Sequence, residues 1–182
     1  VLELKPALKT EFNIEGYPTP EFMDLVLKVK PHQVTLVPDP PDVLTSNAGW
    51  DAKKHASFLK EIIATFKKQN IRTSIFVDTN LDNLNYAAET GTHRVELYTE
   101  AYAKNYSQHR EEAVKSYKQA AERALTLGLG INAGHDLSLE NLSFFAKQVP
   151  GLLEVSIGHA LISEALYLGI ENTIQLYLRQ LA

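Results

Sequence analysis

The sequence of 182 residues predicts an α/β protein with a parallel sheet built from consecutive βα units. Two observations predict this class. Short apolar runs alternate with amphipathic helical patterns along the whole chain, and polar residues follow nearly every apolar run. With 45% hydrophobic and 22% charged residues, the composition is that of one ordinary folded domain.

Six short apolar runs are expected to form strands, at residues 11–14, 33–37, 73–77, 94–98, 129–133 and 154–157. Helical patterns are expected at residues 20–29, 51–69, 81–90, 110–127, 139–148 and 160–181. Thr19 before Pro20, and Ser138 before Leu139 and Glu140, are typical helix starts, because a hydroxyl cap is followed by a proline or an early acidic residue. The connections 38–50 and 99–109 are longer than usual, so we expect loops that close over a ligand.

Six βα units can form an open doubly wound sheet or most of an eight-stranded barrel. Length alone favours the open sheet, because a barrel typically needs about 250 residues. Two observations favour the barrel: no glycine-rich dinucleotide motif follows a strand, and polar residues stand at nearly all strand ends instead of one switch point. We therefore expect a single domain over residues 1–182, a TIM-type (β/α)8 barrel lacking the first one or two βα units.

Charge and composition exclude several classes of function. The 18 basic and 22 acidic residues, a net charge of −4, carry no electrostatic signature of binding to nucleic acid or to an anionic membrane. The absence of cysteine excludes a disulfide framework, a thiolate zinc site and a cysteine nucleophile, and fits a cytoplasmic location. No apolar run approaches the roughly 20 residues of a membrane span.

Two Gly-His pairs, in INAGHD and VSIGHA, each follow a predicted strand directly. Glycine lets the backbone turn at a strand end, so His135 and His159 are expected at the C-terminal rim of the sheet, where α/β active sites lie. His159 also stands in the first turn of the last predicted helix, whose free N–H groups suit a phosphate. The alternative is that both histidines only cap helices.

Carboxylates follow or interrupt the other strands. Alternation in FNIEG places Glu15 on the inner side of the barrel mouth, where partial desolvation would suit a general base; the alternative is a solvated loop residue. Glu96 lies inside an apolar strand and needs a function or a partner, for example an ion pair with Arg94. Asp39 and Asp78 are weaker candidates, equally suited to capping the next helix.

Six segments, in this order and spacing, together resemble the pyridoxine 5'-phosphate synthase family from about Thr10 to the C-terminus: TEFNIEG, QVTLVPD, TSNAGWD, ELYTEAYA, INAGHDL and VSIGHALI. The resemblance implies an eight-stranded barrel with extra helices, assembled as a homo-octamer. It implies closure of a pyridine ring from 3-amino-2-oxopropyl phosphate and 1-deoxy-D-xylulose 5-phosphate, with release of phosphate and water and without a metal or an organic cofactor.

The resemblance also implies roles for individual residues. Glu15 would be a proton acceptor, His135 a proton donor, and Glu96 a carboxylate that stabilises a charged transition state. Thr45 would bind the deoxyxylulose phosphate, and Asp136, Gly158 and His159 would hold the amino-ketone phosphate. Aspartate at position 136 departs from the glycine of some family members, and its charge would repel a phosphate if the side chain faced one.

The family's first two strands supply another catalytic histidine, a phosphate-binding arginine and an Asn-x-Asp-His motif, and none of these is in this sequence. The sequence also starts at Val1 instead of methionine. We therefore expect a natural protein longer by about 50 residues, as the barrel requires, and no activity from the 182 residues alone.

Two other functions remain open on the residues themselves. Glu, Asp and His at strand ends are also how barrels hold divalent cations, which would fit a metal-dependent sugar-phosphate isomerase or epimerase. A non-catalytic phosphate-binding barrel is the second alternative. For the synthase, acid and base groups must face one intermediate, and the loop 38–50 is the expected lid.

Overall fold

The computed structural model describes residues 1–40 and 48–182, and its strands form one six-stranded sheet in chain order. Every neighbouring pair is parallel. The strands are β1 (Asn13–Gly16), β2 (Gln33–Leu36), β3 (Arg72–Val77), β4 (Arg94–Tyr98), β5 (Gly130–His135) and β6 (Leu152–Ile157). The helices are η1 (Lys5–Ala7), α1 (Pro20–Val29), α2 (Ala56–Lys67), α3 (Leu81–Glu89), α4 (Glu100–Thr126), α5 (Leu142–Gln148), α6 (His159–Leu168) and α7 (Ile170–Leu181).

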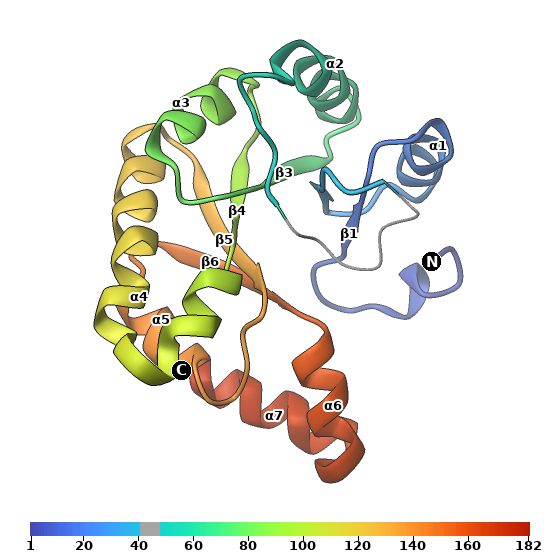
Figure 1. Ribbon diagram of the computed structural model, residues 1–182. Helices are drawn as coiled ribbons and strands as arrows, with labels where there is room; N and C mark the ends of the chain where they lie inside the picture. Colours follow the sequence, from blue (N-terminus) through green and yellow to red (C-terminus); the bar gives the residue numbers. More distant parts are fainter. Residues whose placement is uncertain (41–47) are drawn as a thin grey trace.

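The sheet is curled, with the helices arranged around its outer side (Figure 1). Gln33 on β2 donates from Nε2 to both carboxylate oxygens of Glu154 on β6, at 3.3 Å each. Because β2 and β6 are not neighbours in the sheet, this contact crosses its concave side. Within the described residues, β1 and β6 are the two ends of the sheet, so the fold is the predicted α/β barrel type with some units lacking.

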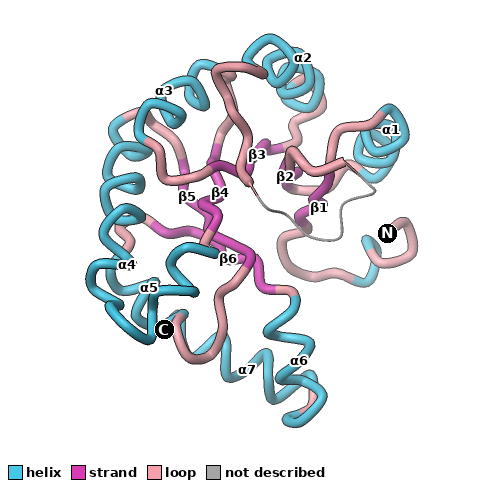
Figure 2. The backbone as a smooth tube through the Cα atoms, in the orientation of Figure 1, coloured by secondary structure: helices cyan, strands magenta, loops and turns pink. Residues whose placement is uncertain are grey.

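The hydrophobic core lies between the sheet and the helices rather than inside the curl. Figure 2 shows the helices around the curled row of strands. Successive residues of a strand face opposite sides. On β4, Val95 and Leu97 are fully buried in the core, whereas Arg94 and Glu96 alternate with them and face the concave side. The largest fully buried side chains of the helices include Phe66 of α2, Leu84 of α3, Tyr102 of α4 and Phe145 of α5.

The concave side is polar at the N-terminal ends of the strands. Arg94 forms a salt bridge of 2.7 Å with Glu154, which also accepts from Asn132 Nδ2 at 3.3 Å. Arg72 Nε donates to Gln33 Oε1 at 2.7 Å. These hydrogen bonds satisfy polar groups that burial would otherwise penalise.

The six predicted strands are all present, with ends shifted by up to two residues. The predicted start of α1 is confirmed: the helix begins at Pro20, and Thr19 Oγ1 accepts from the Phe22 backbone N–H at 3.1 Å. The prediction for Ser138 is wrong. Helix α5 begins at Leu142, and the Ser138 backbone N–H instead donates to Asn141 Oδ1 at 2.9 Å.

The predicted loop 99–109 is wrong. Residues 100–108 form the first part of α4, which continues past a kink at His109 with φ −148° and ψ 63°. The reason is packing: Tyr102 is fully buried, with its ring 4.9 Å from that of Phe145 and 5.9 Å from that of Tyr117.

The predicted helices 51–69 and 160–181 also need correction. The first begins later, at Ala56. The second is two helices, α6 and α7, because Gly169 adopts φ 79° and ψ 141° between them and interrupts the helical backbone.

Candidate active site

A hollow of about 340 Å³ lies at the C-terminal ends of the strands. Its walls come from β1, β3, β4, β5, β6 and the start of α6. The lining residues are Glu15, Phe76, Glu96, His135, Ser156, Ile157, Gly158 and His159. Five of the seven predicted site residues therefore share one hollow. Asp136 adjoins it through His135, and Thr45 lies outside the described residues.

Glu96 is the most deeply buried of the ionisable groups in the hollow, with 1% of its surface exposed. Burial, and next the negative charge of Glu15, raise the pKa of Glu96 to about 8, although hydrogen bonding by the hydroxyls of Ser156 and Thr35 opposes this shift. Its Oε2 atom makes no hydrogen bond within the described part of the chain. Burial therefore favours the neutral acid form of Glu96.

The alternative role of Glu96 as the ion-pair partner of Arg94 is wrong, because Arg94 binds Glu154 instead. Arg94 and Glu96 are two residues apart on one strand, so both face the concave side at different depths. Glu154 lies at the depth of Asn132 and Arg94, toward the N-terminal ends of the strands.

Glu15 lines the hollow from β1, as the alternation predicted. Solvent reaches its side chain through the open mouth, yet the surrounding protein removes enough water to raise its pKa. The charge of Asp39 adds to this rise and that of His135 opposes it. A carboxylate with a raised pKa accepts a proton more readily than an ordinary glutamate near neutral pH.

His135 is the last residue of β5, two residues beyond the predicted strand end. Its Nδ1 atom lies 2.7 Å from Asp136 Oδ2. The ring also contacts the ring of Tyr98 edge to face, with centroids 5.1 Å apart, and lies 6.4 Å from the ring of His159. The two Gly-His pairs therefore lie close together at the rim of the sheet, although they stand at the ends of different strands.

Gly158 and His159 form the start of α6, as predicted. Gly158 occupies the N-cap position without a side-chain cap, so the first N–H groups of the helix lack side-chain acceptors at the edge of the hollow. The positive end of the helix dipole lies there too, and an anion is favoured at such a position.

Sequence reasoning missed the contribution of Ser156 and Phe76 to the hollow. Alternation along β6 is the signal for Ser156, because it stands two residues after the inward-facing Glu154. On β3, Phe76 stands two residues after Ser74, so alternation places both side chains on the concave side.

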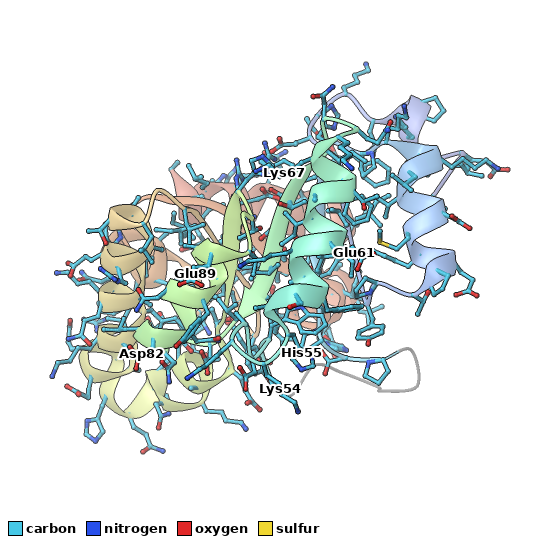
Figure 3. All side chains as sticks on the ribbon, turned by 90° about the horizontal axis from the view of Figure 1, so that it is seen from above. Lys54, His55, Glu61, Lys67, Asp82 and Glu89 are labelled. Carbon is cyan, nitrogen blue, oxygen red and sulfur yellow. The ribbon has the colours of Figure 1, made fainter. Side chains whose placement is uncertain are left out.

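A second hollow of about 340 Å³ lies outside this site, lined by residues 49–51, Lys53, Asp78, Asn80, Asp82, Asn83 and Tyr86. Figure 3 shows Lys54 and His55 beside the start of α2 at the same edge as Asp82 of α3, with Lys67 at the far end of α2. Asp78 Oδ1 accepts from the Asn80 backbone N–H at 3.2 Å, and Asn80 caps α3. Asp78 thus supports a helix start.

Within the described ranges, no group of three or more His, Cys, Asp or Glu residues is placed to hold a metal ion. A search of the same residues finds no helix long and apolar enough to cross a membrane.

Comparisons with known proteins bear on the family and the fold. A family model described as "Pyridoxal phosphate biosynthesis protein PdxJ" matches residues 1–182. A pyridoxine 5'-phosphate synthase from Parabacteroides distasonis is 60% identical over 177 residues, which cover 97% of this chain and 74% of the relative. Another of that name from Christiangramia forsetii is 61% identical over 179 residues, 98% of this chain and 76% of the relative.

A solved structure described as "Native KDPGal structure" has a TM-score of 0.64 at 10% sequence identity and covers 98% of this chain and 71% of that chain. At such identity the likeness shows the fold alone. The family match and the two close relatives show more: the chain belongs to the pyridoxal phosphate biosynthesis protein PdxJ family.

Proposed function

We propose that this protein is a pyridoxine 5'-phosphate synthase, which forms the pyridine ring from 3-amino-2-oxopropyl phosphate and 1-deoxy-D-xylulose 5-phosphate and releases phosphate and water. Family membership and the shared name of both relatives support this. The structural observation that carries the proposal is the one hollow shared by Glu15, Glu96 and His135. Imine formation, repeated proton transfer and elimination all need acid and base groups around a single intermediate.

Glu15 is the proton acceptor and His135 the proton donor in this proposal. They stand on β1 and β5, with three strands between them in the sheet, so they approach the hollow from different sides of the curl. A substrate between them would give up a proton to the carboxylate and receive one from the imidazole.

Glu96 has a role that depends on its charge. As a neutral acid it donates a hydrogen bond to a substrate oxygen. A cationic intermediate close to it would lower its pKa and favour the carboxylate, the form that stabilises positive charge. Glu96 therefore responds to charge that develops during the reaction instead of carrying a fixed charge throughout.

Gly158 and His159 bind the phosphate of the amino ketone, through the backbone N–H groups at the start of α6 and the adjacent imidazole. The family resemblance assigns Asp136 to the same substrate, and here its backbone alone would make that contact, because its carboxylate contacts His135. The resemblance assigns Thr45 to the deoxyxylulose phosphate. The proposed reaction uses no metal and no organic cofactor.

The test is to incubate the purified product of the complete gene with both substrates and to measure pyridoxine 5'-phosphate by mass spectrometry and phosphate release by colorimetry. Equal amounts of both products support the proposal, and absence of pyridoxine 5'-phosphate overturns it. A parallel sample treated with a chelator should keep full activity. Loss of activity that added metal restores would favour the metal-dependent isomerase or epimerase instead.

We further propose a homo-octamer, as the family resemblance implies, located in the cytoplasm, which the absence of cysteine fits. Large apolar side chains exposed on α6, with Leu166 82% and Tyr167 90% accessible, support association with other copies. Native mass spectrometry of the full gene product tests this assembly, and a monomer at working concentration would contradict it.

A further inference from the structure

We infer that Asp136 is a positioning residue that holds His135 in one tautomer and turns its ring toward the hollow. This inference rests on the proposed function, in which His135 donates a proton. Asp136 Oδ2 lies 2.7 Å from His135 Nδ1, and Asp136 itself does not line the hollow. The Asp136 carboxylate thus contacts the His135 imidazole, and this contact is distinct from binding a phosphate.

The backbone of His135 shows why its ring needs to be held. On β5 the inward positions are Asn132 and Gly134, so simple alternation would send residue 135 outward into the core with Ala133. Instead, His135 has φ 100°, and its ring lines the hollow. A positive φ of this size is costly for a residue with a Cβ atom and persists only where the surroundings hold it.

Two neighbours hold the ring itself. The edge-to-face contact with Tyr98 limits its tilt, and the contact with Asp136 limits its rotation. Together they leave the imidazole one orientation.

The turn that carries Asp136 is anchored to the core. Asn141 Nδ2 donates to the Asp136 backbone oxygen at 3.3 Å, and Asn141 Oδ1 accepts from the Ser138 backbone N–H. The backbone oxygen of Asn141 in turn accepts from the fully buried Tyr102 hydroxyl at 2.7 Å. The backbone of Asp136 is therefore anchored to buried structure, and this anchoring keeps its carboxylate beside the imidazole.

The chemistry follows from what a carboxylate can do. It only accepts hydrogen bonds, so the nitrogen that faces it carries the proton, and neutral His135 is the Nδ1–H tautomer. Nε2 then takes up the proton to be donated, and donation from Nε2 restores the same tautomer. Without Asp136, the ring would populate both tautomers and lose the contact that sets its rotation.

The experiment combines nitrogen NMR of protein labelled with ¹⁵N-histidine and steady-state kinetics, both on the full gene product. Variants D136A and D136N are compared with D82N, an exposed aspartate at the start of α3 outside the site. The His135 signals are assigned from their loss in H135Q. Unaltered protein and D82N should show the Nδ1–H tautomer.

In D136A and D136N we expect the Nε2–H tautomer to appear. We also expect kcat to fall at least about tenfold, because a general acid contributes roughly 10²–10⁴-fold and misorientation forfeits part of that. KM for both substrates should stay within about twofold, since neither phosphate loses a contact. D136N keeps the size of the side chain, so it decides the question if D136A does not fold.

An Nε2–H tautomer in the unaltered protein would overturn the inference, and so would D136A and D136N variants with unchanged tautomer and kcat. A raised KM with unchanged kcat would also overturn it, because Asp136 would then act on substrate binding. If the unaltered protein forms no pyridoxine 5'-phosphate, the proposed function fails, while the NMR measurement still decides whether Asp136 sets the tautomer.

Discussion

Gly134 on β5 lies directly against Glu96 on β4: a Cβ atom at position 134 would stand 2.2 Å from Glu96 Oε1. The same atom would lie 3.0 Å from Ser156 Cβ. Gly134 therefore has a second role besides letting the backbone turn at the end of β5. Because glycine has no side chain, the buried carboxyl group of Glu96 can lie beside it.

We expect the variant G134A to displace Glu96 and to destabilise the protein by about 1–3 kcal/mol, the usual cost of overpacking. Its turnover should fall too, because Glu96 leaves its place in the hollow. Urea unfolding and kinetics measure the two effects. In the double variant G134A/E96A much of the stability loss should disappear, since the carboxyl group that clashes is gone. Simple additivity of the two changes would contradict the predicted clash.

Glu96 should make the protein less stable as pH rises. Its folded pKa of about 8 lies above the unfolded value of 4.5, so the folded state binds the extra proton. The stability this contributes is fully present below 4.5 and is lost as pH rises toward 8. We expect E96Q to flatten that decline in urea-unfolding measurements across this pH range. The variant E15Q should reduce it only in part, because it removes one negative charge near Glu96 but leaves the burial. If E96Q lost as much stability with rising pH as the unaltered protein, groups other than Glu96 would cause the loss.

Replacing Glu15 with glutamine should lower turnover far more than substrate affinity. Loss of a general base typically costs about 10²–10⁴-fold, while glutamine keeps the size and polarity of the side chain. In the unaltered protein, activity should rise as Glu15 loses its proton, at a pH above the usual range for glutamate because its pKa is raised. Steady-state kinetics over pH measures both effects, and unchanged turnover in E15Q would remove Glu15 from the mechanism.

The salt bridge between Arg94 and Glu154 should matter for stability more than for chemistry. The variant E154A leaves the amide of Gln33 without its acceptor and the guanidinium of Arg94 with Asn132 Oδ1 in place of a carboxylate, at a cost of about 1–3 kcal/mol. The matched control is K104A, which breaks the exposed pair of Lys104 with Glu100 and should change stability by less than about 0.5 kcal/mol. Equal effects in the two variants would show that the buried network adds nothing.

Local patterns predicted much of the fold and part of the site. Short apolar runs identified all six strands. Alternation identified the inward position of Glu15, because side-chain direction in a strand depends only on position along it. The start of α1 at Thr19 and Pro20 followed from capping chemistry within a few residues. The rim position of His159 followed in the same way, from the glycine before it and the helical pattern after it.

Other features depended on residues that are distant in the chain. Residues 100–108 have no pattern that separates loop from helix, and they are helical because Tyr102 packs between Tyr117 and Phe145. Arg94 binds Glu154 instead of Glu96 because folding brings the Glu154 carboxylate of β6 to the depth of the Arg94 guanidinium. The sequence alone does not show which residues of different strands lie at the same depth in the curled sheet.

The sequence by itself determined the order of the βα units, the strand faces and the rim placement of Glu15, His135 and His159, since each depends on neighbours along the chain. Only the tertiary structure decided the state of these groups. Burial beside Glu15 raises the pKa of Glu96, Gly134 leaves room for its carboxyl group, and the turn anchored by Asn141 aims Asp136 at His135. Desolvation and orientation arise from atoms brought together by folding, so they cannot be read from spacing.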